Sequence, residues 1–192
     1  MSMMLDRMRS TVSTLFLLMV IVVSCSQKRV MIDQAKFESL YRAAKAIEAS
    51  ITVCVTYAKF GELLQSFATE VSIAKDRGKS PEEMKLIGLY FDVLTAYNDS
   101  QTVWKAKIDD ARYQEMREGQ IPADSVEVAA VAGKYGLKIT ERRYKYVRGR
   151  YNTIPPDSIQ AVWSVASEKL KQANSYYYSE DGKPNLTPTA AQ

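Results

Sequence analysis

The stretch Lys75-Asp76-Arg77-Gly78-Lys79-Ser80-Pro81-Glu82-Glu83 decides how this chain folds, because it carries a helix stop followed by a helix start. Gly78 can take the left-handed conformation that commonly ends a helix. Ser80 can cap the next helix, Pro81 suits its first position, and Glu83 completes a capping box. Two helices joined by so short a turn are expected to fold back on one another as an antiparallel hairpin.

Before this turn, a helical pattern extends from Asp33 to Asp76. Apolar residues recur at spacings of four and three, as in a heptad seam: Leu40, Ala44, Ile47, Ile51, Cys54 and Ala58. A second apolar stripe starts at Phe60 and is displaced around the helix. A kink near Gly61 is therefore an alternative to a straight helix. The segment Ile51–Tyr57 is rich in β-branched residues, which favour strands. Helical periodicity on both sides of it nevertheless favours one continuous helix, about 66 Å long.

The second helix is expected to cover Pro81–Glu118, where Gly119 ends it. If the hairpin is antiparallel, the part of the first helix from Leu40 through Ile47 to Ile51 faces Trp104 and Ile108. The expected core face carries four apolar residues, with further ring and aliphatic side chains at neighbouring positions: Met84, Ile87, Phe91 and Leu94, then Tyr90, Tyr97, Trp104, Ile108 and Ala111.

Three shorter helices are predicted after Gly119. Asp124 with Glu127 forms a capping box that opens the first, which ends at Gly136. The second is expected over Thr140–Arg150, followed by a turn at residues 152–155, and Pro156 opens the last. One face of this last helix is apolar: Ile159, Val162, Trp163, Ala166, Leu170, Ala173 and Tyr177.

The predicted fold class is therefore all-α, with a long antiparallel hairpin over residues 33–118 and a smaller cluster of helices over 123–178. Few glycines, 8 in all, together with many good helix formers, agree with this class. Residues 179–192 are polar and contain two prolines, so we expect a disordered tail.

The N-terminal residues carry a targeting signal. Arg7 and Arg9 precede an apolar run from Leu15 to Val23, and the run closes on Val22-Val23-Ser24-Cys25. A basic start, a short apolar core and a small residue before the cut make a secretory signal. The apolar stretch is shorter than the about 20 residues that span a bilayer, which disfavours a transmembrane anchor. A plain secretory signal with an incidental cysteine is the other alternative.

With its cysteine directly after the cut, this segment resembles the signal of bacterial lipoproteins. The resemblance implies that residues 1–24 are removed by the lipoprotein signal peptidase. Cys25 then becomes the first mature residue and carries lipid on its sulfur and amine. Ser26 in place of aspartate resembles the pattern for outer-membrane delivery in Gram-negative bacteria, so we expect an outer-membrane protein facing the periplasm. Residues 25–32 are then a lipidated tether, and 33–178 the helical domain.

Composition and charge disfavour several classes of function. The net charge of +4 falls to +3 without the signal, a mild excess that does not favour a nucleic-acid partner. The chain has no histidine, the commonest general base and metal ligand, and no zinc, phosphate-loop or nucleophile motif. We therefore predict no catalytic residues, no metal and no cofactor. Cys54 lies among apolar residues and is expected to be a buried small hydrophobe.

The strongest local charge lies between Lys134 and Arg150, where seven basic residues face the single acid Glu141: Lys134, Lys138, Arg142, Arg143, Lys145, Arg148 and Arg150. On the expected helix, Arg142, Lys145 and Arg148 share one side. We predict that these three residues and Arg143 bind phosphate or carboxylate groups of an anionic lipid or cell-wall polymer. The alternative is a solvated helix face whose charge is balanced by acids of other helices.

The leading functional hypothesis is a lipid-anchored envelope protein with a non-enzymatic binding, scaffold or assembly role. Its expected partners are the membrane, through the anchor, and an envelope protein. The alternatives are a carrier of a small hydrophobic or anionic ligand between helices, or an enzyme acting on cell-wall or lipid substrate. Trp104 and Trp163 are expected to be inter-helix anchors rather than sugar-stacking platforms. Of the tyrosines at 176–178, at least one ring must point outward.

Overall fold

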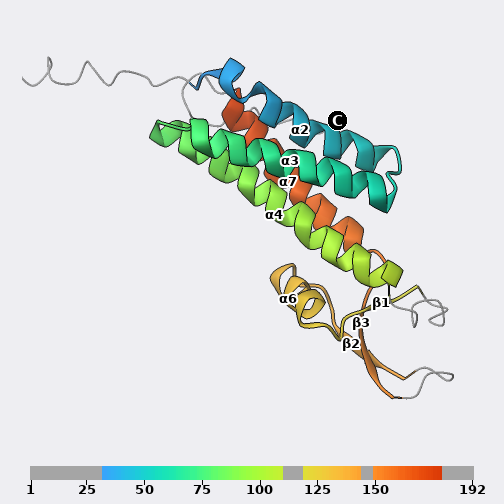
Figure 1. Cartoon of the computed structure of the whole chain (residues 1–192). Coiled ribbons are helices and arrows are strands. Elements are labelled where there is room, and N and C mark those ends of the chain that lie inside the picture. The colour runs from blue at the N-terminus through green and yellow to red at the C-terminus, as the bar shows by residue number, and fades with distance from the viewer. Residues whose placement is uncertain (1–31, 110–118, 144–148, 179–192) are drawn as a thin grey trace, which may run out of the picture. The chain divides into compact units, whose positions relative to one another are not determined.

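The computed structural model describes residues 32–109, 119–143 and 149–178 (Figure 1), all within one unit of the chain, residues 31–192. In these ranges the protein is mainly α-helical, with five helices and one small sheet of three strands. The all-α prediction is thereby confirmed. The signal, Cys25, the tether up to residue 31 and the tail after residue 178 lie outside the described residues.

Four helices form a bundle: α2 (Gln34–Thr52), α3 (Tyr57–Arg77), α4 (Pro81–Asp109) and α7 (Ser158–Tyr177). Helix α3 packs between α2 and α4, and α4 makes the most extensive contact of the bundle with α7 (Figure 1). Contact between α2 and α7 is light. No helix in the described ranges combines the length and the apolar character that crossing a membrane requires.

The single long helix expected over residues 33–76 is wrong, because the chain breaks between α2 and α3. Cys54 adopts the left-handed conformation, with φ at +64°, and turns the backbone out of α2. The side chain of Thr56 then caps α3 by accepting a hydrogen bond from the backbone N of Lys59, at 3.3 Å. The β-branched residues here weaken the helix, as their propensities imply, but they form a turn and not a strand. Gly61 lies inside α3, away from the break.

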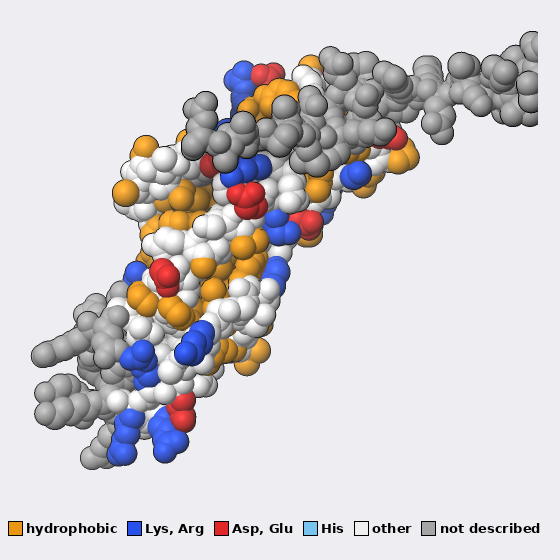
Figure 2. Space-filling view, turned by 180° about the vertical axis from the view of Figure 1, so that it is seen from behind, with side chains coloured by type: hydrophobic (Ala, Val, Ile, Leu, Met, Phe, Trp, Pro, Cys, Tyr) orange, Lys and Arg blue, Asp and Glu red, His pale blue; other side chains and the backbone are white. Residues whose placement is uncertain are grey.

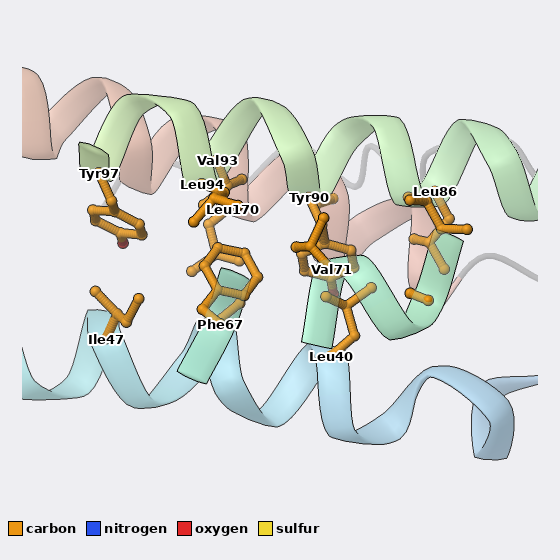
Figure 3. Packing of buried hydrophobic residues seen from close by; sticks show 14 of the residues in the cluster. Leu40, Ile47, Phe67, Val71, Leu86, Tyr90, Val93, Leu94, Tyr97 and Leu170 are labelled. Carbon is orange, nitrogen blue, oxygen red and sulfur yellow. The ribbon is translucent and has the colours of Figure 1, made fainter. Parts of the chain in front are cut away.

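This break reverses the expected pairing. Helix α3 runs antiparallel to both α2 and α4, so α2 runs parallel to α4 (Figure 1). Leu40 accordingly lies level with Tyr90, and Ile47 level with Tyr97 (Figure 3). The predicted packing of this part of α2 against the end of α4 is wrong.

The turn at residues 78–80 forms through the predicted capping box. Ser80 Oγ accepts a hydrogen bond from Glu83 N at 3.1 Å, and Glu83 Oε2 accepts from Ser80 N at 3.2 Å. Glu83 Oε1 also accepts from Lys36 Nζ of α2 at 2.6 Å. Gly78 is not left-handed, since its φ is −63°. Glycine suits this position because a Cβ would lie 2.6 Å from Ile87 Cδ1.

The buried face of α4 differs from the prediction. Met84 and Phe91, expected in the core, are 49% and 44% exposed, and Ile108 is 48% exposed. Because α4 contacts both α3 and α7, its buried arc is wider than one apolar stripe: Leu86, Ile87, Tyr90, Val93, Leu94, Ala96, Tyr97, Ser100 and Val103. The predicted end of this helix, with Ala111, lies outside the described residues.

Beyond α4 the chain builds a smaller region, here called the tip, from β1 (Ile121–Pro122), α6 (Val126–Lys134), β2 (Thr140–Arg142) and β3 (Tyr151–Ile154). The sheet is antiparallel with strand order β1-β3-β2. The helix predicted over residues 140–150 and the turn over 152–155 are therefore wrong. Thr140 of β2 and Tyr151, Thr153 and Ile154 of β3 are β-branched or aromatic residues, which favour strands.

Helix α6 exists as predicted, but its cap is different. Ser125 Oγ accepts a hydrogen bond from Val128 N at 3.2 Å. Asp124 Oδ1 accepts from Asn152 N at 2.9 Å, so this carboxylate ties α6 to β3 and does not form the predicted capping box. Gly136 takes the expected left-handed conformation, with φ at +63°.

Two hydrophobic cores share one aromatic junction. The bundle core includes the buried residues of α2, α3 and α4 in Figure 3, and the tip has its own core. Trp104 and Trp163 pack against both cores, with ring centroids 5.4 Å apart. Trp163 Nε1 donates to Ser100 Oγ at 3.0 Å. Both tryptophans act as inter-helix anchors, as predicted.

Candidate functional site

The predicted site is the basic segment, Lys134–Arg150. Its described residues are distributed over the end of α6 and the hairpin of β2 and β3. Arg142 pairs across the hairpin with Tyr151 and is half-buried, whereas Arg143 is exposed. Consecutive residues of an extended chain tend to point to opposite faces, which agrees with the different exposure of these two side chains. Arg142 lies in β2 and not on the predicted helix, whereas Lys145 and Arg148 lie outside the described residues.

Acids neutralise part of the remaining charge. Lys134 Nζ lies 2.6 Å from Asp99 Oδ2 of α4, and Arg150 Nη1 lies 3.2 Å from Glu141 Oε2. Figure 2 shows Lys and Arg side chains gathered at the sheet end of the described chain, with acidic side chains among them. For these residues the alternative of a balanced, solvated face is thus partly right.

Asp99 positions the tip against the bundle. Its Oδ2 accepts hydrogen bonds from Lys134 Nζ at 2.6 Å and from the Tyr135 hydroxyl at 2.8 Å. Burial, reinforced by the Asp99 carboxylate, raises the pKa of Tyr135 above its usual value. The carboxylate therefore fixes the end of α6 on α4, and with it the start of the basic segment.

A second candidate site lies at the opposite end of the bundle, here called the entry end because α2 begins there. Lys36 of α2 meets Glu83 of α4 at this end, and Gln34 meets Tyr177 of α7. Between α2 and α7 opens a groove of about 410 Å³, here called the tyrosine groove, lined by Gln34, Ala35, Glu38, Tyr41, Arg42, Tyr177 and Tyr178.

Three rings shape the tyrosine groove. Tyr41 stacks on Tyr177 with centroids 5.0 Å apart and an interplanar angle of 6°, and Tyr178 meets Tyr41 edge-on at 5.5 Å. Tyr177 donates its hydroxyl to the backbone O of Gln34 at 2.9 Å and is 4% exposed. Tyr178 is 52% exposed, which confirms that one of the three consecutive rings points outward.

Polar groups complete the groove. Arg42 Nη2 donates to Glu38 Oε1 at 2.5 Å, one turn apart on α2, and both side chains are more than half exposed. The groove was not predicted, because Tyr41 and Tyr177 are distant in sequence. The spacing of Glu38, Tyr41 and Arg42 is the one signal for it, since these residues share a face of α2 outside the apolar seam.

Cys54 was expected in the core and is exposed. It sits in the turn between α2 and α3 beside Val53, which is 77% exposed. The apolar run around it therefore belongs partly to a surface turn.

Neither end of the described bundle holds a cluster of three or more metal-binding side chains, and the same is true of the rest of the described residues. Comparison of the chain with protein-family models, with curated proteins and with solved structures finds no match.

Proposed function

We propose that this chain is a lipid-anchored protein of the bacterial cell envelope with a non-enzymatic binding role. The observation that carries the proposal is the run Val22-Val23-Ser24-Cys25 at the end of a short apolar segment. Only residues 26–33 separate Cys25 from α2, so the anchor leads almost directly into the bundle. An acylated cysteine holds such a domain at a membrane when two or more chains are attached.

The bundle supports a role in presenting the tip. Helix α4 has 29 residues and is therefore about 43 Å long. It begins at the entry end, beside Lys36, and its far part contacts β1 and α6. The basic segment begins where Lys134 meets Asp99, 18 residues along α4 and thus about 27 Å from the entry end, as suits a protein that reaches from its anchor to a partner.

Several observations favour binding over the two alternatives. Among the described residues that line the tyrosine groove, only Glu38 carries a carboxylate, and it is paired with Arg42. Glycoside hydrolysis generally needs two carboxyl groups. Large side chains fill the middle of the bundle, and Phe67, Tyr90 and Tyr97 are at most 1% exposed. Such packing leaves little room for a ligand carried between these helices.

The anchor is tested with the chain's two cysteines. Metabolic labelling with palmitate should mark the wild type and Cys54→Ala equally, because Cys54 is not part of the signal. Cys25→Ala should lose the label and accumulate as a precursor. Label that persists in Cys25→Ala, or disappears in Cys54→Ala, contradicts the proposal.

The binding role is tested at the tip. Changing Arg142, Arg143, Lys145 and Arg148 to Gln should weaken cross-linking of the tip to envelope components, and binding of the wild type should decline with salt. A matched control changes four lysines of the bundle to Gln: Lys59, Lys79, Lys169 and Lys171. Equal loss in both variants would show that only net charge matters.

A further inference from the structure

We propose that the tyrosine groove binds the headgroup of a zwitterionic phospholipid, one that carries a phosphate and a primary ammonium. The headgroup belongs to the bilayer that holds the lipid of Cys25. This inference rests on the proposed function, because the anchor is what brings the groove to the bilayer. It adds a site at the opposite end of the bundle from the basic segment.

Chain length places the groove within reach of headgroups. Nine residue steps separate Cys25 from Gln34, the first groove residue. At about 3.3–3.6 Å per step, even a fully extended tether spans only about 30 Å. The entry end is thus confined to the neighbourhood of the bilayer, whereas the tip is not.

The charges of the groove match those of the proposed headgroup. Arg42 donates to Glu38 through Nη2, and a guanidinium group has five N–H donors, which leaves others for a phosphate. Glu38 has a second carboxylate oxygen that can accept from an ammonium group. A positive and a negative side chain one helical turn apart therefore complement a phosphate and an amine joined by a short linker.

The aromatic rings supply the rest of the chemistry. Tyr178 is 52% exposed, so part of its ring is open to an ammonium group, which aromatic faces attract. Tyrosine is also enriched where proteins meet the bilayer surface, because its ring is apolar and its hydroxyl polar. The volume of about 410 Å³ falls in the range of small-ligand sites.

A weak contact is sufficient here. The anchor makes headgroup binding effectively intramolecular, and short flexible linkers give effective concentrations in the millimolar range. If the bundle stands away from the bilayer while its entry end is docked, the tip begins about 27 Å off, at the Lys134–Asp99 contact. That is several Debye lengths of about 8 Å each. The anionic partner of the basic segment is then something other than the anchoring bilayer.

The experiment uses the lipidated full chain in vesicles of phosphatidylethanolamine and phosphatidylcholine, and in parallel in vesicles that contain phosphatidylglycerol. Once Cys25 is acylated, Cys54 is the remaining thiol of the chain, and it is exposed. It follows α2, whose 19 residues place it about 28 Å from the entry end. A donor dye is attached to Cys54 and an acceptor dye is placed in the lipid. The efficiency of energy transfer then reports the distance of Cys54, at the end of α2, from the bilayer surface.

The wild type should give one narrow distribution of transfer efficiencies. Arg42→Gln combined with Tyr178→Ala should lose it and give a broad distribution, while Tyr178→Phe retains it because the ring is kept. Arg143→Gln combined with Arg150→Gln is the matched control at the tip and should behave as the wild type. Circular dichroism confirms that each variant is folded.

Three results would overturn the inference. One is equal distributions for the wild type and the groove variant. Another is a change only in the tip variant, which would assign docking to the basic segment. The third is a groove effect seen only in phosphatidylglycerol vesicles and abolished by salt, which would mean simple attraction to negative charge. Absence of lipid on Cys25, checked by mass spectrometry, contradicts the proposed function separately.

Discussion

The bundle and the tip are stabilised in different ways. The bundle core is built around large rings, among them Phe60, Phe67, Tyr90 and Tyr97. The nine buried residues of the tip core are small or aliphatic, and three of them, Val103, Ile159 and Val162, belong to α4 and α7. The tip therefore cannot complete its core without the bundle, whereas the bundle core contains no residue of the sheet or α6. Destabilising the bundle should therefore also destabilise the tip, whereas destabilising the tip should leave the bundle folded.

Removing a ring from the bundle is the strongest test of this asymmetry. Phe67 is fully buried and lies 6.3 Å from the ring of Tyr90, so Phe67→Ala should lower the free energy of unfolding by about 3–5 kcal/mol. Urea titration followed by circular dichroism measures it, and the tip should unfold in the same transition. Phe91→Ala is the matched control, because Phe91 is 44% exposed and its loss should change little.

Alkaline pH should also act on the bundle. Burial raises the pKa of Tyr90 and of Tyr97 well above the usual value of 10. In the unfolded chain these phenols lose their protons near pH 10, so their contribution is complete below that pH and is lost as the pH rises further. Each phenol should lower stability by up to about 1.4 kcal/mol per pH unit. Urea titrations at pH 9 and pH 11 measure this decrease in the free energy of unfolding. A slope unchanged by Tyr97→Phe contradicts this assignment.

The turn at the entry end gives a smaller effect. In Gly78→Ala the new Cβ would lie 2.6 Å from Ile87 Cδ1 and 2.9 Å from Met84 Sδ, so overpacking should destabilise the protein by about 1–3 kcal/mol. Gly88→Ala is the control in the same region. A Cβ there meets nothing within 4 Å, and alanine should stabilise α4 by about 0.5–1 kcal/mol. Thermal unfolding separates the two, and equal midpoints would contradict the close approach at Gly78.

Loosening the tip alone should have the smallest global effect. Asp99→Asn removes the charge that holds Lys134 and Tyr135, which should weaken the docking of α6 by about 1–2 kcal/mol. Hydrogen exchange in α6 should become faster while amides of α2 and α3 keep their protection. If the amides of the bundle lose protection to the same degree, the two regions are not asymmetric and the comparison fails.

The parts predicted correctly depend on local rules. Every apolar position expected on the last helix faces a core, because α7 has one apolar face in an otherwise polar helix. The capping box of Ser80 with Glu83 needs only residues within one turn. Both features can be deduced from spacing alone.

The parts predicted wrongly depend on distant partners. The buried arc of α4 is set by two neighbouring helices, so Met84 and Phe91 are exposed although their spacing suits a core face. The hairpin at Arg142–Tyr151 is closed by β1, which lies about 20–30 residues earlier in the chain. The tyrosine groove combines residues from both ends of the described chain. None of these associations is contained in a short window of sequence.

The unequal contacts of α2 and α4 with α7 have a mechanical consequence. Tension on the proposed lipid anchor would enter the fold at Gln34, the first residue of α2. The links from α2 to α7 are few: the Gln34–Tyr177 hydrogen bonds, the ring stack of Tyr41 on Tyr177, and Ser167 Oγ donating to Glu48 Oε1. Force applied there loads two contacts of α2, the light one with α7 and the more extensive one with α3. A load on the tip is divided between α4 and α7, which shear along their whole shared length. Under tension between the two ends, the light α2–α7 contact is the weakest of these, and the packing of α2 on α3 carries most of the load on α2.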